Sequence, residues 1–187
     1  MNDAVAREAV RLLALVAVAV VLVRSAFGER GERSVAATGW QFVWVLYLVN
    51  YAIVWRHLIV LNTPAWYDAV ARPLGIALML AGIALVAWAY AAMGGYWSGS
   101  ISVREDHRVV VWGPFAFVRH PVYAGYLLGV SGAAIALADP VAAFAAIVSV
   151  PIMAGRARAE ERFLEARLGD AYRDYRRRVR MFVPGLF

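Results

Sequence analysis

A run of 21 residues without a charged side chain, residues 73–93, constrains this chain more than any other feature. A helix needs about 20 apolar residues to cross roughly 30 Å of hydrocarbon, so this run predicts a membrane-spanning helix. The rest of the chain agrees, because 63% of its 187 residues are hydrophobic. A soluble domain of this length could not bury so much apolar surface. We therefore expect an all-α integral membrane protein.

Four further apolar runs bring the expected number of transmembrane helices to about five. Residues 12–27 are short, but flanking arginines that snorkel can extend them. Residues 40–61 are interrupted by polar side chains and carry aromatic residues that would suit a membrane interface. Residues 122–138 and 141–154 are each slightly short for a span, and only an Asp-Pro pair separates them.

The Asp139-Pro140 pair predicts a tight helical hairpin. Asp can cap a helix and Pro suits its first turn, so the second arm can begin directly after the first arm ends. Small residues in the first arm would let helices approach one another closely. They are Gly125, Gly129, Ser131, Gly132, Ala133 and Ala134.

The chain changes character at Arg156. From there, apolar residues recur at three- and four-residue steps, while arginines and acids occupy the other faces. This pattern is typical of an amphipathic helix at the membrane surface or against the bundle. We expect a C-terminal amphipathic cytoplasmic helix, which Gly169 can break.

The first apolar run, residues 12–23, follows two arginines and in this respect resembles a signal peptide. No small-x-small cleavage site follows it, so we expect the run to be retained as a span.

All 19 basic residues are arginines, and five spans would distribute them 15 against 4 between the two sides of the membrane. The positive-inside rule then places residues 94–120 and the C-terminal tail in the cytoplasm and the N-terminus outside. We expect a bacterial inner membrane. Membrane topology explains the net charge of +6 better than nucleic-acid binding does, because the charges flank apolar runs.

One candidate site lies where the expected fourth span begins. Pro121 suits the first turn of a helix, so His120 is expected near the N-cap and Tyr123 one turn inside. Free backbone N–H groups at such a terminus favour a carboxylate or another acceptor of a ligand. The simpler interpretation is that Arg119 and His120 only mark the membrane boundary.

A second candidate site follows the last apolar run. Arg156 and Glu160 are four residues apart and share a helical face, and Glu161 is adjacent. Two acids near hydrocarbon are unfavourable without partners. Salt bridges to neighbouring arginines would be the simpler explanation. The chain has no cysteine, which excludes a thiolate nucleophile and a cysteine metal site.

Taken in order, a set of residues in the C-terminal half forms one pattern. It consists of His107, Val110, Gly113, Pro114, Phe115, Arg119, His120, Pro121, Tyr123, Gly125, Glu160, Glu161, Leu164, Gly169, Tyr172, Tyr175 and Pro184. This pattern resembles the isoprenylcysteine carboxyl methyltransferase family and the related membrane phospholipid methyltransferases. The resemblance covers roughly residues 94–187.

The resemblance implies a methyltransferase that uses S-adenosyl-L-methionine and acts on a lipophilic acceptor, a carboxylate first of all. It implies that Arg119 and Arg156 are catalytic candidates, with Arg156 in the position that contacts the substrate. Phe115 replaces a tyrosine common in the family. The residues implied to bind the cofactor are His107, Val109, Val110, Phe115, His120, Pro121, Tyr123, Glu160 and Glu161.

The chemistry suits these residue types, because a sulfonium methyl donor needs neither a metal nor a covalent enzyme intermediate. The acceptor, a lipophilic small molecule or a lipid-anchored substrate, would enter from the bilayer among membrane lipids. We expect residues 1–93 to form a three-span membrane region. Residues 94–187 would form the catalytic core of the same structural domain.

Three alternatives remain open. A phospholipid or amine N-methyltransferase would have the same cofactor site, but it would need no arginine to bind an acceptor carboxylate. An NADPH-dependent sterol-type reductase resembles the same region, but its acidic pattern includes a cysteine that is missing here. A non-enzymatic membrane component would bind a partner through the polar loop and no cofactor.

Overall fold

The computed structural model describes residues 3–27, 52, 61–94 and 109–184. Those residues are mostly helical and include no β-strand, so the expected helical architecture is confirmed for this part of the chain. The elements are α1 (Asp3–Phe27), the π-helical turn η1 (Tyr67–Ala71), α3 (Arg72–Met93), the 3₁₀ turn η3 (Gly113–Ala116), α4 (Pro121–Leu137), α5 (Pro140–Leu168) and α6 (Asp170–Arg178).

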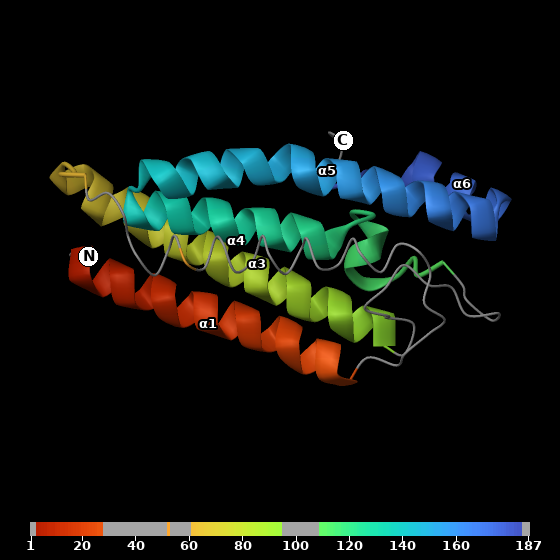
Figure 1. Ribbon diagram of the computed structural model, residues 1–187, viewed down its shortest axis with the longest axis horizontal. Helices are drawn as coiled ribbons and strands as arrows, with labels where there is room; N and C mark the ends of the chain where they lie inside the picture. Colours follow the sequence, from red (N-terminus) through yellow and green to blue (C-terminus); the bar gives the residue numbers. More distant parts are fainter. Residues whose placement is uncertain (1–2, 28–51, 53–60, 95–108, 185–187) are drawn as a thin grey trace.

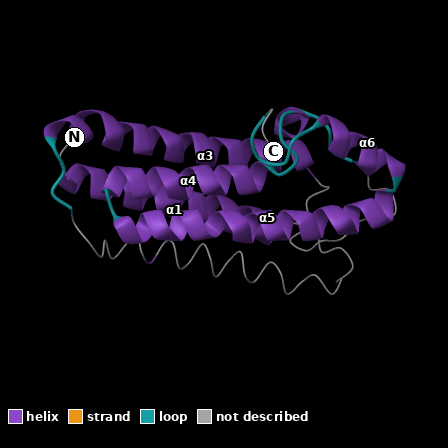
Figure 2. Ribbon diagram, turned by 90° about the horizontal axis from the view of Figure 1, so that it is seen from above, coloured by secondary structure: helices purple, strands orange, loops and turns teal. Residues whose placement is uncertain are grey.

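The four long helices lie along a common direction (Figures 1 and 2). α1 and α3 begin at the same end of the bundle, α4 runs back, and α5 runs in the direction of α3. α6 turns back at the end of α5. The start of α4, the second half of α5 and α6 therefore share one end of the molecule.

Among the residues that the structure describes, two helical stretches are long and apolar enough to cross a membrane, Tyr67–Met93 and Pro140–Leu168. Pro121–Leu137 is apolar but shorter. The second expected span, residues 40–61, lies almost wholly outside the described residues, so the count of five stays a prediction. α1 packs into the bundle, because Val10 is fully buried in a cluster with Met79 and Leu137.

The outer faces of the helices carry large apolar side chains. Phe144 and Ile147 on α5 are 68% and 69% exposed, and Leu74 on α3 is 53% exposed. Apolar patches of this kind are unfavourable in water and suit a hydrocarbon surrounding. They support the interpretation of α3 and α5 as membrane helices.

The expected hairpin is confirmed. The Asp139 carboxylate accepts hydrogen bonds from the N–H groups of Val141 and Ala142 at 2.8 and 3.2 Å, so it caps α5. Ala138, in the left-handed region at φ +51°, ends α4 just before this cap. Pro140 occupies the first turn of α5, where its missing N–H removes no helical hydrogen bond.

The second arm differs from the prediction in length. The sequence suggested an arm ending at residue 154 and a separate helix from Arg156, but α5 is continuous to Leu168. The residues after 154 are mostly Ala, Arg and Glu, which favour helix, so the loss of hydrophobicity does not interrupt the backbone. The break occurs at Gly169, whose φ of +56° is accessible to glycine at little cost.

α3 and α4 form the most extensive helix contact, and glycines make it possible. A Cβ atom added at Gly82 would lie 2.5 Å from the Gly125 carbonyl oxygen. One added at Gly132 would lie 2.5 Å from the Gly75 carbonyl oxygen. The small residues expected to allow close packing therefore do so at Gly125 and Gly132, and their partners are glycines of α3.

We predict that Gly82→Ala lowers the melting temperature of the purified protein in detergent. The new methyl group would overlap the backbone of α4 and force the helices apart, at a cost of about 1–3 kcal/mol. Gly155→Ala is the matched control, because a Cβ atom there meets nothing within 4 Å. Equal melting temperatures for both variants would contradict this view of the α3–α4 contact.

Candidate active site

Side chains from three segments meet at the end of the bundle where α4 begins. Arg119 and His120 precede α4, Tyr123 lies in its first turn, and Glu160 and Glu161 lie on α5. The two candidate sites seen in the sequence are therefore one cluster, although about 40 residues separate them in the chain. His120 is the N-cap residue of α4, as its position before Pro121 suggested.

Glu161 lies at the centre of this cluster, and its side chain is only 2% exposed. Its Oε1 atom is 2.7 Å from Arg119 Nε and 3.1 Å from His120 Nε2. Its Oε2 atom is 3.4 Å from Arg176 Nε of α6. A carboxylate this deeply buried needs such partners, because an unpaired buried charge is strongly unfavourable.

Glu160 points to a different set of partners and remains 29% exposed. Its Oε2 atom accepts a hydrogen bond from the Tyr123 hydroxyl at 2.9 Å and lies 3.8 Å from His120 Nδ1. The Tyr123 hydroxyl in turn accepts a hydrogen bond from Arg156 Nε at 3.1 Å. Arg156 and Glu160, four residues apart on α5, thus meet at one hydroxyl of α4.

Aromatic rings form a wall beside these charges. The rings of His120 and Tyr123 are stacked, with centroids 5.5 Å apart and planes 10° from parallel. Phe182 meets the His120 ring edge-on at 6.1 Å. Tyr123 and Tyr126 also belong to a buried apolar cluster with Met153. The polar cluster therefore sits directly on an apolar layer.

The C-terminal segment is bound to the residues that precede α4. The N–H groups of Arg119 and His120 donate to the carbonyls of Arg180 and Met181 at 2.7 and 3.1 Å. The Arg119 guanidinium donates to the carbonyls of Val179 and, at 3.1 Å, Arg176. Arg119 therefore holds the tail in place through both its backbone N–H group and its side chain.

Tyr175 of α6 adds a further link, because its hydroxyl donates to the carbonyl of Phe115 in η3 at 2.7 Å. Burial raises the pKa of Tyr175, so the hydroxyl stays protonated and remains a donor. Tyr172, buried on the same face of α6, has a pKa raised by the same cause. These two tyrosines fix α6 against the site.

The remaining residues expected at the site are placed less centrally. Val109 and Val110 are half-buried in the segment leading to η3, and Phe115 is half-buried within η3. Pro121 is buried in the first turn of α4. His107 lies outside the described residues.

Sequence reasoning missed Arg176, Met181 and Phe182 as parts of the cluster. Their contacts to Glu161 and His120 depend on how the tail folds back after Gly169. The periodic tyrosines of the tail signalled a buried face, but several arginines of α6 looked equivalent in the sequence. Only the three-dimensional structure distinguishes Arg176 from its neighbours.

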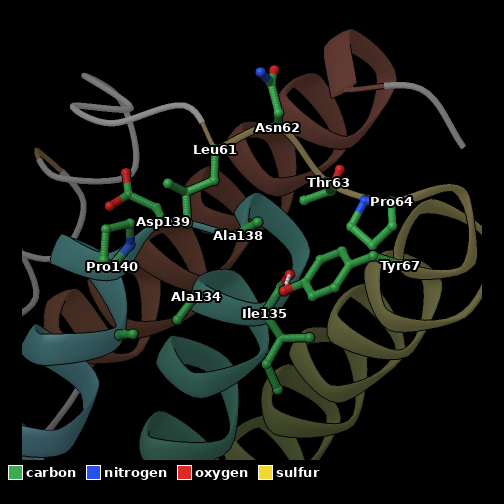
Figure 3. Close-up of a pocket in the computed structure, with 11 residues that line it drawn as sticks. Leu61, Asn62, Thr63, Pro64, Tyr67, Ala134, Ile135, Ala138, Asp139 and Pro140 are labelled. Carbon is green, nitrogen blue, oxygen red and sulfur yellow. Dashed lines mark hydrogen bonds between the residues drawn. The ribbon is translucent and has the colours of Figure 1, made fainter.

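A cavity of about 420 Å³ lies at the opposite end of the bundle, around the α4–α5 turn (Figure 3). Next to it, the buried Arg72 guanidinium contacts Asp68 at 2.6 Å and the Ala136 carbonyl at 2.8 Å. This cavity is far along α4 from His120. Its lining consists of Leu61, Asn62, Thr63, Pro64, Tyr67, Ala134, Ile135, Ala138, Asp139, Pro140 and Ala143.

Comparison with known proteins gives a consistent family signal. The model of the isoprenylcysteine carboxyl methyltransferase family matches residues 75–166. Protein-S-isoprenylcysteine O-methyltransferase B of Arabidopsis thaliana is 32% identical over 113 residues, which are 59% of this chain and 57% of the relative. Methanethiol S-methyltransferase 1 of Bradyrhizobium diazoefficiens is 40% identical over 70 residues, 37% of this chain and 24% of the relative.

A third relative, the cobalt-zinc-cadmium resistance protein CzcN of Cupriavidus metallidurans, is 31% identical over 123 residues. These are 65% of this chain and 54% of the relative. The chain thus spans only about half, or less, of the length of these relatives. Within the described residues, no group of three or more His, Asp or Glu side chains is arranged to hold a metal ion.

We predict that Glu161→Gln strongly destabilises the protein. The change leaves Arg119, whose side chain is 8% exposed, without its carboxylate, and breaking a buried pair from one side costs about 3–5 kcal/mol. Thermal unfolding in detergent measures the effect. Asp170→Asn is the control, because Asp170 pairs with Arg173 but is 88% exposed, so its loss should change little. A similar, small shift for both variants would rule out a structural role for Glu161.

Proposed function

We propose that this chain, whose residues 75–166 match the model of the isoprenylcysteine carboxyl methyltransferase family, is a membrane methyltransferase of that family that uses S-adenosyl-L-methionine. We propose further that its acceptor is lipophilic and carries a carboxylate, as in an isoprenylcysteine. The observation that carries the proposal is the meeting of Glu160 and Arg156 at the Tyr123 hydroxyl. An anionic and a cationic binding group are thereby adjacent at one end of the bundle.

The residues present fit the cofactor. Glu160 is partly exposed and offers carboxylate oxygens to an ammonium group. The start of α4 has no side-chain cap, so its first-turn N–H groups can bind a carboxylate. The stacked rings of His120 and Tyr123 offer a flat apolar wall beside both groups.

S-adenosyl-L-methionine supplies a methyl group activated by a sulfonium centre, so the chain needs only to bind, orient and exclude water. Glu160 would hold the ammonium group, and the start of α4, with Pro121, would hold the carboxylate. Phe115 would stack on adenine, and His107, Val109 and Val110 would complete the wall. The buried Glu161 acts indirectly, because it positions His120 and the tail.

Arg156 is the better candidate for contact with the acceptor. The Arg119 guanidinium is engaged with Glu161 and with backbone carbonyls of the tail. Arg156 is only half-buried and lies beside Glu160 through Tyr123. A guanidinium in this position can orient a carboxylate by two parallel hydrogen bonds. A carboxylate is nucleophilic at neutral pH, so no general base is required.

A thiol is the second candidate acceptor. It is favoured by the similarity to a protein named methanethiol S-methyltransferase 1. A small thiol has no carboxylate for an arginine to bind, and it does not need to reach the site from the bilayer. The two acceptors therefore differ in their dependence on Arg156.

We propose that the site end of the bundle faces the cytoplasm and that the N-terminus lies outside. The described arginines support this orientation, because those of α5, α6 and the tail lie at the site end, whereas Arg7, Arg11 and Arg72 lie at the other. We also propose that residues 1–93 and 94–187 form one structural domain. The tight contact between α3 and α4 across this boundary supports it.

Glu160→Gln should weaken the binding of S-adenosylhomocysteine by about tenfold or more, because a charge-assisted hydrogen bond contributes about 1.5–3 kcal/mol. Isothermal titration calorimetry in detergent measures this. Asp174→Asn, at an exposed acid of α6, is the control and should bind normally. Unchanged binding in Glu160→Gln would refute the assignment of Glu160. Stabilisation of the wild-type protein by NADPH instead of S-adenosylhomocysteine would favour the reductase alternative.

Arg156→Ala should abolish methyl transfer to a prenylcysteine carboxylate and leave transfer to a thiol or amine largely intact. The loss follows from the missing guanidinium, which no longer orients the carboxylate. Transfer of a tritiated methyl group to N-acetyl-S-farnesylcysteine, to methanethiol and to a phospholipid amine measures the three activities. Arg158→Ala is the matched control, because Arg158 is exposed two residues further along α5. Full activity of Arg156→Ala on the carboxylate would exclude this role.

A further inference from the structure

Large apolar side chains are exposed around η3 and at the end of α3. Trp112 and Phe117, which flank η3, are 49% and 60% exposed, and Val111 is 46% exposed. Trp88, in the last turns of α3, is 49% exposed, and its ring centroid lies 6.3 Å from that of Phe117. We refer to Trp88, Val111, Trp112 and Phe117 as the interface patch. Apolar surface of this kind is unfavourable in water and marks a contact with lipid or protein.

Close contacts hold the interface patch on the end of α3. The Trp112 indole Nε1 donates to the Ala92 carbonyl at 3.0 Å, so the polar group of this ring is bonded within the protein. A Cβ atom added at Gly113, whose φ is +61°, would lie 2.9 Å from Ala92 Cβ, so glycine lets η3 lie directly against α3. The Phe115 carbonyl accepts a hydrogen bond from the Tyr175 hydroxyl at 2.7 Å, which ties η3 to α6 as well. The patch residues thus stay exposed on a segment that is fixed in place.

The length of the span indicates the depth at which the patch lies. The helical stretch Tyr67–Met93 can cross a membrane, and Trp66, which directly precedes it, is 64% exposed. Trp66 and Trp88 are 22 residues apart, which corresponds to about 33 Å at a rise of 1.5 Å per residue. The hydrocarbon layer is roughly 30 Å thick, and Trp is enriched at both of its interfaces with water. This spacing favours one interface at Trp66 and the other at the interface patch.

The patch also continues the exposed side of α3. Exposed apolar residues recur along this helix at three- and four-residue steps and therefore share one face. They are Leu74, Ala77, Ala81, Ala84 and Trp88. Trp88 ends this stripe and contacts Phe117, so one apolar surface runs from the span onto η3. Lipid is the occupant that can cover such a surface without a break.

We propose that the interface patch is a membrane-docking surface, and that it binds the phospholipid layer between headgroups and acyl chains on the side of the candidate active site. The proposal goes beyond the proposed function, because it depends on no reaction and no cofactor. η3 then contacts lipid through the patch and α6 through Phe115. Arg119 and His120, directly after Val118, lie at the level of the headgroups, where an amphiphilic molecule presents its polar end.

The chain has no cysteine, so a single bimane label can report the surroundings of the patch in the full-length protein. We place the label at Phe117→Cys and reconstitute the protein in nanodiscs of phosphatidylcholine and phosphatidylglycerol. Acrylamide in the water should quench it several-fold less than a label at Ala171→Cys, an exposed position on α6. Lipids brominated near the headgroup should quench it more than lipids brominated near the chain end. Val150→Cys, exposed in the apolar part of α5, should show the reverse preference.

Equal quenching by acrylamide at Phe117→Cys and Ala171→Cys would overturn the proposal, because the patch would then lie in water. Protection of the label from both acrylamide and brominated lipid would also overturn it, since a second copy or another protein would then cover the patch. A preference for lipids brominated near the chain end would contradict the proposed depth. Val111→Cys should repeat the result of Phe117→Cys, and it decides the question if Phe117→Cys lowers the melting temperature of the protein.

Discussion

The buried carboxylate of Glu161 is the constraint on which this end of the molecule depends. With 2% exposure it needs cationic or donor partners, and they come from the residues before α4 and from α6. One unfavourable group thus determines how three segments meet. Its neighbour on α5, Glu160, faces another direction by the helical rotation and remains partly exposed. The adjacent acids therefore divide into a buried, paired group and a partly exposed group, and the exposed one is the proposed ligand-binding acid.

The glycine contact between α3 and α4 supports the site from the membrane side. Gly125, two residues after Tyr123, lies against the backbone of Gly82. Because backbone meets backbone there, the axis of α4 has little room to shift. The first turn of α4 carries Tyr123 and the N–H groups that no side chain caps. The glycine contact with α3 fixes this turn on one side, and the hydrogen bonds to the C-terminal tail fix it on the other. The proposed alignment of two ligands at this end of the bundle would benefit from such rigid support.

Local chemistry made much of this arrangement predictable from the sequence. The hairpin followed from the capping Asp139 and from Pro140, and the break after α5 followed from Gly169. The juxtaposition of His120 with Glu160 followed only from the family resemblance, since no periodicity relates residues 40 positions apart. The predicted length of α5 was too short, because the change from apolar to charged residues after residue 154 was taken as the end of the helix. Arg, Ala and Glu nevertheless favour helix and continue it. The contacts of Arg176 and Phe182 were unpredictable, because they depend on the tertiary path of the tail.

The position of the cluster at the end of apolar helices strengthens the electrostatic interactions of its charges. Tyr123, Tyr126 and Met153 form a buried apolar layer beside it, which keeps water from screening the charges on that side. In such surroundings the attraction between Glu160 and the ammonium group of the proposed cofactor would exceed that of an exposed pair, because fewer water molecules screen it.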